Sequence, residues 1–540
     1  DEDLQILKSL QFLSHLDISN TEISDLGMDY IGLKRAMKYL DLSKTKITDE
    51  GLNKISSLVI LEHLTVSHCE ISDAGINSLS NFLKLTYLNI SSCSKVTYVA
   101  FKVISQFYSL ETLHSTSNIR VSDLGISFLS QSLNLKKLSI SFLLNPGIKA
   151  ISSIHNLLHV ELNNCDLSNE GISNLNNLEN LQSLQISSCK IDKLDLSVFP
   201  SLISSLSELD LSDNETESQT IFGLDLFVNL KSLKLSNIDG TTFNSISHLN
   251  RLTFLEITKS HISDKEMINL SQMYELNHLK LENCDNMTNE GMRYLQNLTN
   301  LYNLSLYNSK CIDDSGISYI SNLENLITLE LTGFKKITSL SIRYIANFSK
   351  LKHLNLMSCS QLNDGIFDIS EIYSDLLTLN IRKCSNITSD GFQELAGSHH
   401  LAEIKLSDNQ KNSLKNVLNI FENLNINIIF DNEEPEEEEA VQFQDFKEAP
   451  EFMSTFGEDF NPENIWDTPN DTLTRPGRNV SRKSYVDYAP KTEIVTTRDP
   501  DGTLVTRKYT TITSTNNTVT DEHVSSSVPR SPPNESISES

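Results

Sequence analysis

A short apolar pattern recurs along most of the chain, and this repetition restricts the possible folds more than any other feature. The unit reads L-x-x-L-x-L-x-x-C/N/T and is followed, two or three residues later, by I-S/T-D-x-G-I/L. Fixed periods of 20 to 50 residues are typical of solenoids, in which each unit packs on its neighbours. Seventeen units succeed one another at spacings of 22 to 25 residues, and we number them repeats 1 to 17 by their first apolar residues: Leu13, Met37, Leu61, Leu85, Leu110, Leu135, Leu157, Leu181, Leu206, Leu230, Leu252, Leu276, Leu301, Leu326, Leu351, Leu376 and Leu401.

Each unit predicts one strand and one short helix. The L-x-L core alternates apolar and polar residues, as a strand with one buried face does. The second half, for example GINSLSNFLKL at residues 75–85, places apolar residues three to four apart, as a short helix does. Neither element can bury a core alone. We therefore predict an α/β solenoid with parallel strands on its concave face and short helices on its convex face. Strands about 4.8 Å apart would make a curved sheet about 80 Å long.

The segments SSCSKV, ENCDNMTNEGM and RKCSNITSDG each carry a cysteine after the strand. This pattern resembles the leucine-rich repeat, and its C-x-x-I-T-D-x-G form resembles the cysteine-containing subclass found in F-box substrate receptors of ubiquitin ligases. The resemblance covers residues 1 to about 430. It implies a solenoid adaptor that binds a protein partner and, in its narrower form, substrate recognition for an SCF-type (Skp–cullin–F-box) ubiquitin ligase.

The chain begins inside a repeat. Its first sixteen residues align without a gap with residues 49–64, but no strand precedes them. We therefore expect the natural sequence to continue upstream with at least one more L-x-x-L-x-L segment.

Composition changes sharply near Phe430, where the last strand-like run, INIIF, ends. Ten of the twelve prolines lie after residue 431. We predict a leucine-rich-repeat solenoid at residues 1–430, an acidic aromatic disordered segment at 431–470, and a Ser/Thr/Pro-rich tail at 471–540. Alternating β-formers on both sides of D-P-D-G predict a hairpin at residues 491–513 of this tail.

Charge narrows the classes of partner. The net charge of −27 argues against binding to a phosphate backbone, because no basic face exists to displace counterions. No apolar run approaches the roughly 18 residues of a membrane span. We therefore expect protein partners and no nucleic acid, membrane span or small-molecule substrate.

Most of the cysteines share one repeat position, at the corner after the strand. Asn118, Asn214 and Asn409 occupy this position in other repeats, so a small polar side chain suits it. Disulfides or a metal site are alternatives, but we expect buried, reduced thiols and therefore a protein of the cytosol or nucleus. The cysteines at this position are Cys69, Cys93, Cys165, Cys189, Cys284, Cys359 and Cys384.

Two further rows of side chains have a functional and a structural interpretation. A row of aspartates before the helices could bind cations along the edge, but we expect these residues to be helix N-caps; they are Asp25, Asp49, Asp73, Asp123, Asp264 and Asp314. A column of histidines on the exposed strand face could bind metal, but its closest members are two strands, about 10 Å, apart. Contact with a partner or plain surface is the better interpretation for His15, His63, His159, His278 and His353.

No catalytic motif accompanies the repeats. The patterns G-x-x-x-x-G-K-S/T, G-x-G-x-x-G, H-E-x-x-H and G-x-S-x-G are all missing. We expect a binding protein rather than an enzyme, with no cofactor and no metal. A secreted or cell-surface adhesion and recognition protein is the alternative, and the N-x-S/T sequons at Asn89, Asn286 and Asn386 would suit it.

The outward strand positions predict a partner site. The residue six after the first apolar residue is small and polar in repeats 1 to 10, but large or charged in most of repeats 12 to 16. Because a few aromatic and arginine anchors usually hold a partner, we predict binding on the concave face of repeats 11 to 16; random drift on a solvated face is the alternative. The predicted contact residues are Phe254, His278, Lys280, Glu282, Tyr302, Tyr307, Met357 and Arg382.

The acidic segment at 431–470 carries large apolar residues that a solvated linker would not need. Such segments can fold onto a partner, so we predict a second binding segment here; docking on the solenoid's own end is the alternative. Its residues are Phe443, Phe446, Phe452, Met453, Phe456, Phe460 and Trp466.

Overall fold

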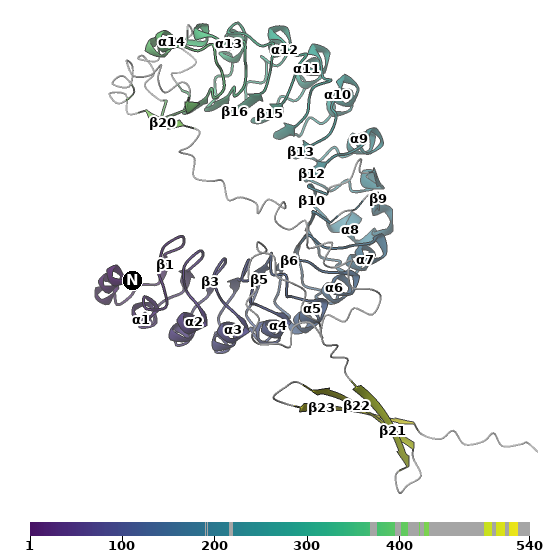
Figure 1. Cartoon of the computed structure of the whole chain (residues 1–540). Helices are drawn as coiled ribbons and strands as arrows, with labels where there is room; N and C mark the ends of the chain where they lie inside the picture. Colours follow the sequence, from purple (N-terminus) through teal and green to yellow (C-terminus); the bar gives the residue numbers. More distant parts are fainter. Residues whose placement is uncertain are drawn as a thin grey trace, which may run out of the picture. The chain divides into compact units, whose positions relative to one another are not determined.

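The computed structural model describes residues 1–189, 191, 193–214, 220–367, 375–394, 401–408, 421 and 426–430, and the backbone of three strands at 491–498, 504–513 and 518–527 (Figure 1). The chain divides into two compact units, Asp1–Gly457 and Glu458–Ser540.

The first unit is built around one parallel sheet of eighteen strands. Each of the seventeen repeats contributes a strand that starts two residues after its first apolar residue, and β20 follows the last repeat. Neighbouring strands pair in register, so that Leu40, Leu64 and Leu88 lie side by side. The strands are β1 (His15–Asp17), β2 (Tyr39–Asp41), β3 (His63–Thr65), β4 (Tyr87–Asn89), β5 (Thr112–Ser115), β6 (Lys137–Ser141), β7 (His159–Asn163), β8 (Ser183–Ser187), β10 (Glu208–Leu211), β12 (Ser232–Ser236), β13 (Phe254–Thr258), β14 (His278–Leu281), β15 (Asn303–Tyr307), β16 (Thr328–Thr332), β17 (His353–Asn355), β18 (Thr378–Asn380), β19 (Glu403–Leu406) and β20 (Asn427–Phe430).

Short helices follow most strands and line the outer side of the unit, while the strands line its inner, concave side (Figure 1). The predicted α/β solenoid is thereby confirmed. The α-helices are α1 (Met28–Ile31), α2 (Asp49–Ile55), α3 (Asp73–Ser78), α4 (Tyr98–Ile104), α5 (Asp123–Phe128), α6 (Asn145–Ile151), α7 (Asn169–Ser173), α8 (Pro200–Ser205), α9 (Gly240–Ile246), α10 (Asp264–Leu270), α11 (Asn289–Leu295), α12 (Asp314–Tyr319), α13 (Ser341–Ile345) and α14 (Ser389–Glu394). The 3-10 helices are η1 (Glu2–Ser9), η2 (Leu129–Gln131), η3 (Asn174–Asn177), η4 (Leu196–Val198), η5 (Leu224–Leu226) and η6 (Asp364–Phe367).

Repeats 8 and 9 depart from the predicted helical second half. A short strand follows the main strand in each, β9 (Lys193–Asp195) and β11 (Thr220–Phe222), and the two pair in parallel. The sequence KLDL explains the first of these strands, because its leucines recur every second residue and both are buried.

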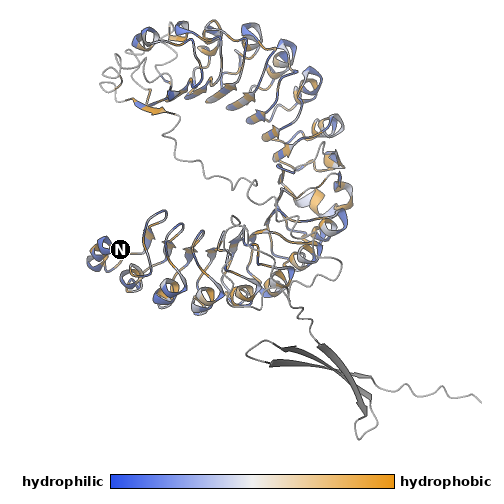
Figure 2. Cartoon of the chain, viewed as in Figure 1, coloured by the Kyte–Doolittle hydropathy of each residue, from blue (hydrophilic) through white to orange (hydrophobic). Residues whose placement is uncertain are grey.

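The core is a stack of apolar columns between the sheet and the helices. In repeat 3 the three apolar residues of the strand pattern, Leu61, Leu64 and Val66, are completely buried, and neighbouring repeats supply the same positions. Apolar and polar residues accordingly alternate along the strands and helices (Figure 2). Each fully buried leucine or valine contributes about 1.5–3 kcal/mol to folding relative to leaving it exposed. The stability of the solenoid therefore comes from the sum of these contributions over many repeats.

A left-handed residue ends the strand segment of repeats 1 to 16. It stands seven residues after the first apolar residue, and examples are Asn20 (φ 54°), Lys44 (φ 53°) and Ser92 (φ 58°). Glycine fills the position only in repeat 14, as Gly333 (φ 77°). This conformation is costly for residues with a Cβ atom, and asparagine tolerates it best among them. Its recurrence shows that the chain must turn sharply here before the next residue enters the core.

In several repeats the side chain that follows this turn bonds to the preceding repeat. The Sγ atom of Cys93 donates to the carbonyl of Val66 at 3.2 Å, and Nδ2 of Asn118 donates to the carbonyl of Ile90 at 2.8 Å. All eight cysteines are free; seven are buried and Cys311 is exposed. Burial raises the pKa of Cys93 to about 12, so its thiol stays protonated and can donate this bond.

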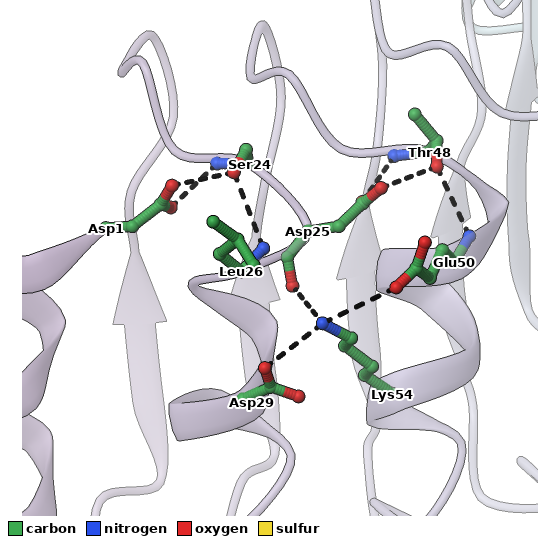
Figure 3. A network of polar contacts seen from close by, with 8 residues as sticks. All are labelled: Asp1, Ser24, Asp25, Leu26, Asp29, Thr48, Glu50 and Lys54. Carbon is green, nitrogen blue, oxygen red and sulfur yellow. Dashed lines mark hydrogen bonds and ion pairs between the residues drawn. The ribbon is translucent and has the colours of Figure 1, made fainter.

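The aspartate row links repeats instead of capping its own helices, which corrects the prediction. In α2, Asp49 is the first helical residue, and the cap is Thr48, whose Oγ1 accepts from the backbone N–H of Glu50 at 3.3 Å. The carboxylate of Asp25, one repeat earlier, accepts from the Thr48 backbone N–H at 2.8 Å and from its hydroxyl at 2.7 Å (Figure 3). The same pair of contacts, at 2.5–2.9 Å, is made by Asp1, Asp49, Asp73, Asp264, Asp314 and Asp364.

This inter-repeat ladder explains the glycine of the repeat pattern. A Cβ atom on Gly51 would lie 2.4 Å from Oδ1 of Asp25, and one on Gly75 would lie 2.4 Å from Oδ1 of Asp49. Real Cβ atoms do not approach oxygen this closely. The aspartate of one repeat therefore leaves room only for glycine at this position of the next repeat.

The second unit contains an antiparallel sheet of three strands, β21 (Lys491–Arg498), β22 (Leu504–Thr513) and β23 (Thr518–Ser527). Strands β21 and β22 pair with Arg498 opposite Leu504, at the segment where the sequence predicts a hairpin. The third strand was not predicted. The segment 431–470 lies outside the described residues, and the boundaries at 430 and 470 stay predictions.

Candidate functional site

The inner face of the sheet is the surface that helices leave uncovered. Residues two and four positions after the first apolar residue point away from the core, while the leucine between them is buried, as in His278, Leu279 and Lys280. Because the strands pair in register, each of these positions forms a column across the repeats. A binding site on this face would therefore be made of residues from neighbouring columns and several repeats.

Part of the predicted site is a charged and aromatic network on β12 to β14. The rings of Phe254 and His278 stack with centroids 4.1 Å apart, and Nε2 of His278 lies 3.3 Å from Oε1 of Glu256. The neighbouring ring of His278 is the main reason why the pKa of Glu256 is lowered, and the ammonium of Lys234, 3.7 Å from that carboxylate, acts in the same direction.

Tyr307 joins this network to the next strands. Its hydroxyl donates to Glu330, and the ammonium of Lys280 lies 5.6 Å from the centre of its ring. Lys280 also lies 3.3 Å from the carboxylate of Glu282. Burial and the neighbouring Glu330 raise the pKa of Tyr307, so this hydroxyl remains a donor. The structure thus brings together five of the predicted residues, but it pairs most of their charges with each other.

Arg382 does not face outward as predicted. Its side chain is 5% exposed, and Nη2 donates to the carbonyl of Phe430 on β20 at 3.4 Å. Its place near the end of the sheet explains this burial, because β20 lies two strands away and the side chain bonds to it; Ser407, at the same position of the last repeat, is also buried. A large residue at this position is therefore poor evidence for a partner contact. Met357, at the same position of repeat 15, is half-buried.

An apolar row that sequence reasoning largely missed lies at the first position, directly before the strands of repeats 13, 14 and 16. Tyr302, Ile327 and Leu377 are 46%, 40% and 38% exposed. With Lys352 they form one row, because each backbone N–H donates to the carbonyl of the preceding member at 2.8 Å. Only Tyr302 was predicted. Comparing this column over consecutive repeats, instead of the sixth, could have revealed the rest.

A polar recess adjoins this row on strands β16 to β19. Its lining includes Glu330, His353 and Lys405. Nδ1 of His353 lies 2.9 Å from the hydroxyl of Thr378 on the next strand. The recess offers hydrogen-bonding groups beside exposed apolar side chains, and this combination is common at protein interfaces.

A second group of residues on repeats 1 to 5 was predicted only in part, since the sequence analysis named His15 and His63 but not their tyrosine neighbours. Here the sequence predicts a featureless surface because its sixth positions are serine or threonine, but the second positions alternate histidine and tyrosine. The rings stack from strand to strand: His63 and Tyr87 have centroids 3.9 Å apart and planes 8° apart. The alternation H-Y-H-Y at one position of four successive repeats was the available signal.

The described residues carry neither a group of metal ligands nor a membrane-spanning helix. Within them, no three histidine, cysteine, aspartate or glutamate side chains are grouped in a way that could hold a metal ion. No helix in that part of the chain is long and apolar enough to cross a membrane. The predicted tail segment with Phe443, Phe446, Phe452, Phe456, Phe460 and Trp466 lies outside the described residues.

Comparison with known proteins identifies the repeat. Residues 9–32, 35–56 and 60–80 match the family model described as Leucine Rich repeat. The chain therefore contains leucine-rich repeats, as the sequence pattern predicted, while the cysteine-containing subclass is not part of that match. No curated protein matches the chain.

Several solved structures align with this chain at low identity and low TM-score. An internalin (inlF) from Listeria monocytogenes is 21% identical, covering 65% of this chain and 88% of its own, with a TM-score of 0.39. Rad7 in its yeast complex with Elc1 is 17% identical over 79% of this chain and 92% of that chain, with a TM-score of 0.36. A TLR13–ssRNA13 complex is 16% identical over 74% of this chain and 75% of that chain, with a TM-score of 0.43. These likenesses concern the fold alone.

The fold and the repeats define a leucine-rich-repeat solenoid. Solenoids of this class are typically binding scaffolds for protein partners and not enzymes, because stacked repeats create a long, regular surface.

Proposed function

We propose that the protein is an interaction scaffold that holds a protein partner on the concave face of repeats 11 to 16. One observation carries this proposal: the exposed row of Tyr302, Ile327 and Leu377 beside the polar recess. These side chains belong neither to the buried core nor to the partly buried residues packed against it. Interfaces are usually held by a few aromatic and aliphatic anchors within a polar surround.

The network around Tyr307 is assigned a secondary role in binding the partner. Its members already bond to one another, so a partner that separates them must replace those bonds. We assign Phe254, His278, Lys280, Glu282, Tyr307 and Met357 to the surround that orients the partner. Arg382 is assigned to the end of the solenoid, because it bonds to β20.

The test compares two double variants in affinity purification from cells with quantitative mass spectrometry. Tyr302→Ala with Leu377→Ala removes two members of the row. Tyr274→Ala with Leu340→Ala is the matched control, because these side chains are 55% and 46% exposed and lie beside helices α10 and α13 instead of directly before a strand. We expect partners retained by the wild type and the control to be depleted about tenfold or more by the first variant, as for loss of about 1.4 kcal/mol. Equal retention by both variants would place the partner elsewhere.

Substrate recognition for an SCF-type ubiquitin ligase is a narrower form of this proposal. Its support is the cysteine position, where Cys69, Cys93, Cys359 and Cys384 each donate to a strand carbonyl of the preceding repeat. Ligase subunits of the Skp and cullin classes should then co-purify with the protein. If they are absent from material that retains other partners, the scaffold proposal survives and the ligase role does not.

We further propose a cytosolic or nuclear location, in preference to a secreted adhesion protein. The support is the set of free, mostly buried thiols and the position of the Asn89 sequon, which lies half-buried on β4, where a glycan would crowd the concave face. Fractionation of cells that express the native gene tests this. Glycosylated protein in the medium or at the cell surface would favour the alternative.

A further inference from the structure

The aromatic residues of repeats 1 to 5 form one continuous ladder across five strands. Ring centroids are 6.0 Å apart for His15 and Tyr39, 4.3 Å for Tyr39 and His63, and 3.9 Å for His63 and Tyr87. The ladder ends at His114, whose ring is tilted and lies 5.3 Å from Tyr87. A groove runs along it, lined also by the hydroxyls of serines at the sixth position.

Two carboxylates lie beside the first half of the ladder. Asp17 and Asp41 stand directly opposite each other on the paired strands β1 and β2. In each, Oδ1 accepts a backbone N–H within its own turn, from Ser19 at 2.9 Å and from Ser43 at 2.8 Å. The second oxygen of both carboxylates has no hydrogen-bond donor among the described residues. Because paired strands are about 4.8 Å apart, the two carboxylates are near neighbours on this face, and a cation between or above them would be stabilised.

The ladder adds no positive charge that would oppose such a cation at neutral pH. Burial lowers the pKa of His63 and of His114, which keeps both rings neutral, and burial raises the pKa of Tyr39 and of Tyr87. The charged groups around it are few: Lys44 at a turn of the groove, Glu161 at its far end, and Lys137 on β6 beyond the ladder.

We propose that this groove binds an extended, arginine-bearing peptide segment of a second protein, independently of the site on repeats 11 to 16. Guanidinium groups suit the location because they bond to two carboxylate oxygens and also pack on aromatic rings. From β1 to β5 the groove spans about 19 Å, which corresponds to about six residues of extended chain. The long-range field of a chain with net charge −27 also favours a basic partner.

The probe is a fluorescein-labelled nine-residue peptide of alternating arginine and serine, measured by fluorescence anisotropy with the full chain at physiological salt. Two test variants address the two halves of the site: Asp17→Asn with Asp41→Asn removes the charges, and Tyr39→Ala with Tyr87→Ala breaks the ladder. Because the chain has 71 acidic residues, the control Asp210→Asn with Asp225→Asn removes the same charge elsewhere. Asp210 is well matched to Asp41, since its Oδ1 likewise accepts from a serine two residues later, at 3.0 Å.

We expect both test variants to bind the peptide about tenfold more weakly than the wild type, and the control to bind it unchanged. A peptide with citrulline in place of arginine should lose binding to the wild type. Circular dichroism melting curves check that the variants are folded. The proposal is overturned if the wild type shows no binding at about 1 mM chain, if the control loses as much affinity as the charge variant, if the ladder variant keeps its affinity, or if the citrulline peptide binds equally well.

Discussion

The aspartate ladder makes a sharp prediction about the cohesion of the solenoid. Asp49 of repeat 2 accepts from the backbone N–H of Ser72 at 2.8 Å and from its hydroxyl at 2.5 Å. Ser72 is in turn the N-cap of α3 in repeat 3. Asp49→Ala removes both bonds between the two repeats and leaves the Ser72 groups without their acceptor.

The expected cost follows from these contacts. Hydrogen bonds to a charged group contribute about 1.5–3 kcal/mol each, and partial exposure of Asp49 places both near the lower limit. We expect Asp49→Ala to lower the free energy of unfolding by about 2–4 kcal/mol. Asp49→Asn should cost only about 1 kcal/mol, because Asn145 makes both contacts naturally, with its Oδ1 3.1 Å from the Ser168 N–H and its Nδ2 2.9 Å from the Ser168 hydroxyl.

Urea denaturation followed by circular dichroism at 25 °C measures this difference, and hydrogen exchange at the amides of α3 shows whether the loss is local. Glu70→Ala is the control, since the exposed pair of Glu70 and Lys95 should contribute only about 0–1 kcal/mol. The reasoning fails if Asp49→Ala lies within about 0.5 kcal/mol of the wild type, or if asparagine is as harmful as alanine.

Three further predictions concern other features of the repeats. Gly75→Ala should lower the free energy of unfolding by about 1–2 kcal/mol in urea denaturation, since its Cβ atom would meet Asp49. Gly240→Ala is the control and should be neutral or stabilising, because a Cβ atom there would have no atom within 4 Å. Similar values for both variants would contradict the argument from the aspartate ladder. With Ellman's reagent the native protein should react rapidly at one thiol, that of Cys311, and at all eight thiols after unfolding in guanidinium. The reason is burial, which raises the pKa of Cys93 and Cys359 to about 12. Rapid labelling of several thiols in the native protein would contradict this burial. Because folding lowers the pKa of His63, the unfolded chain binds more protons at mildly acidic pH, and stability should fall as the pH drops from about 7 to 5. The fall should be smaller in His63→Gln, and an unchanged pH profile in this variant would refute the assignment.

Periodicity explains why the sequence alone predicts the architecture. The positions of Leu61, Leu64 and Val66 recur as apolar residues from repeat to repeat at fixed spacing, so the only way to bury them all is to stack the repeats in register. The same logic predicts parallel strands, outer helices and an inner face whose columns follow from the repeat spacing. The seven shared cysteine positions were interpretable for the same reason, because one position in a stack has one environment.

Contacts between neighbouring repeats are the part that only the tertiary structure decides. A repeat pattern states which residues are equivalent, but not which atoms of adjacent copies meet. Asp49 therefore resembled a cap of its own helix, although it bonds to Ser72 of the next repeat and excludes a side chain at Gly75.

The prediction of the binding site was the least accurate, because it depended on the directions in which side chains point. Arg382 at the sixth position is buried because it bonds to β20, while Ile327 at the first position stays exposed. The stacking of Tyr39 between His15 and His63 likewise needs the spacing and twist of real strands. Sequence thus determined the columns of this solenoid, and the contacts between side chains of neighbouring strands decided which members of a column reach solvent.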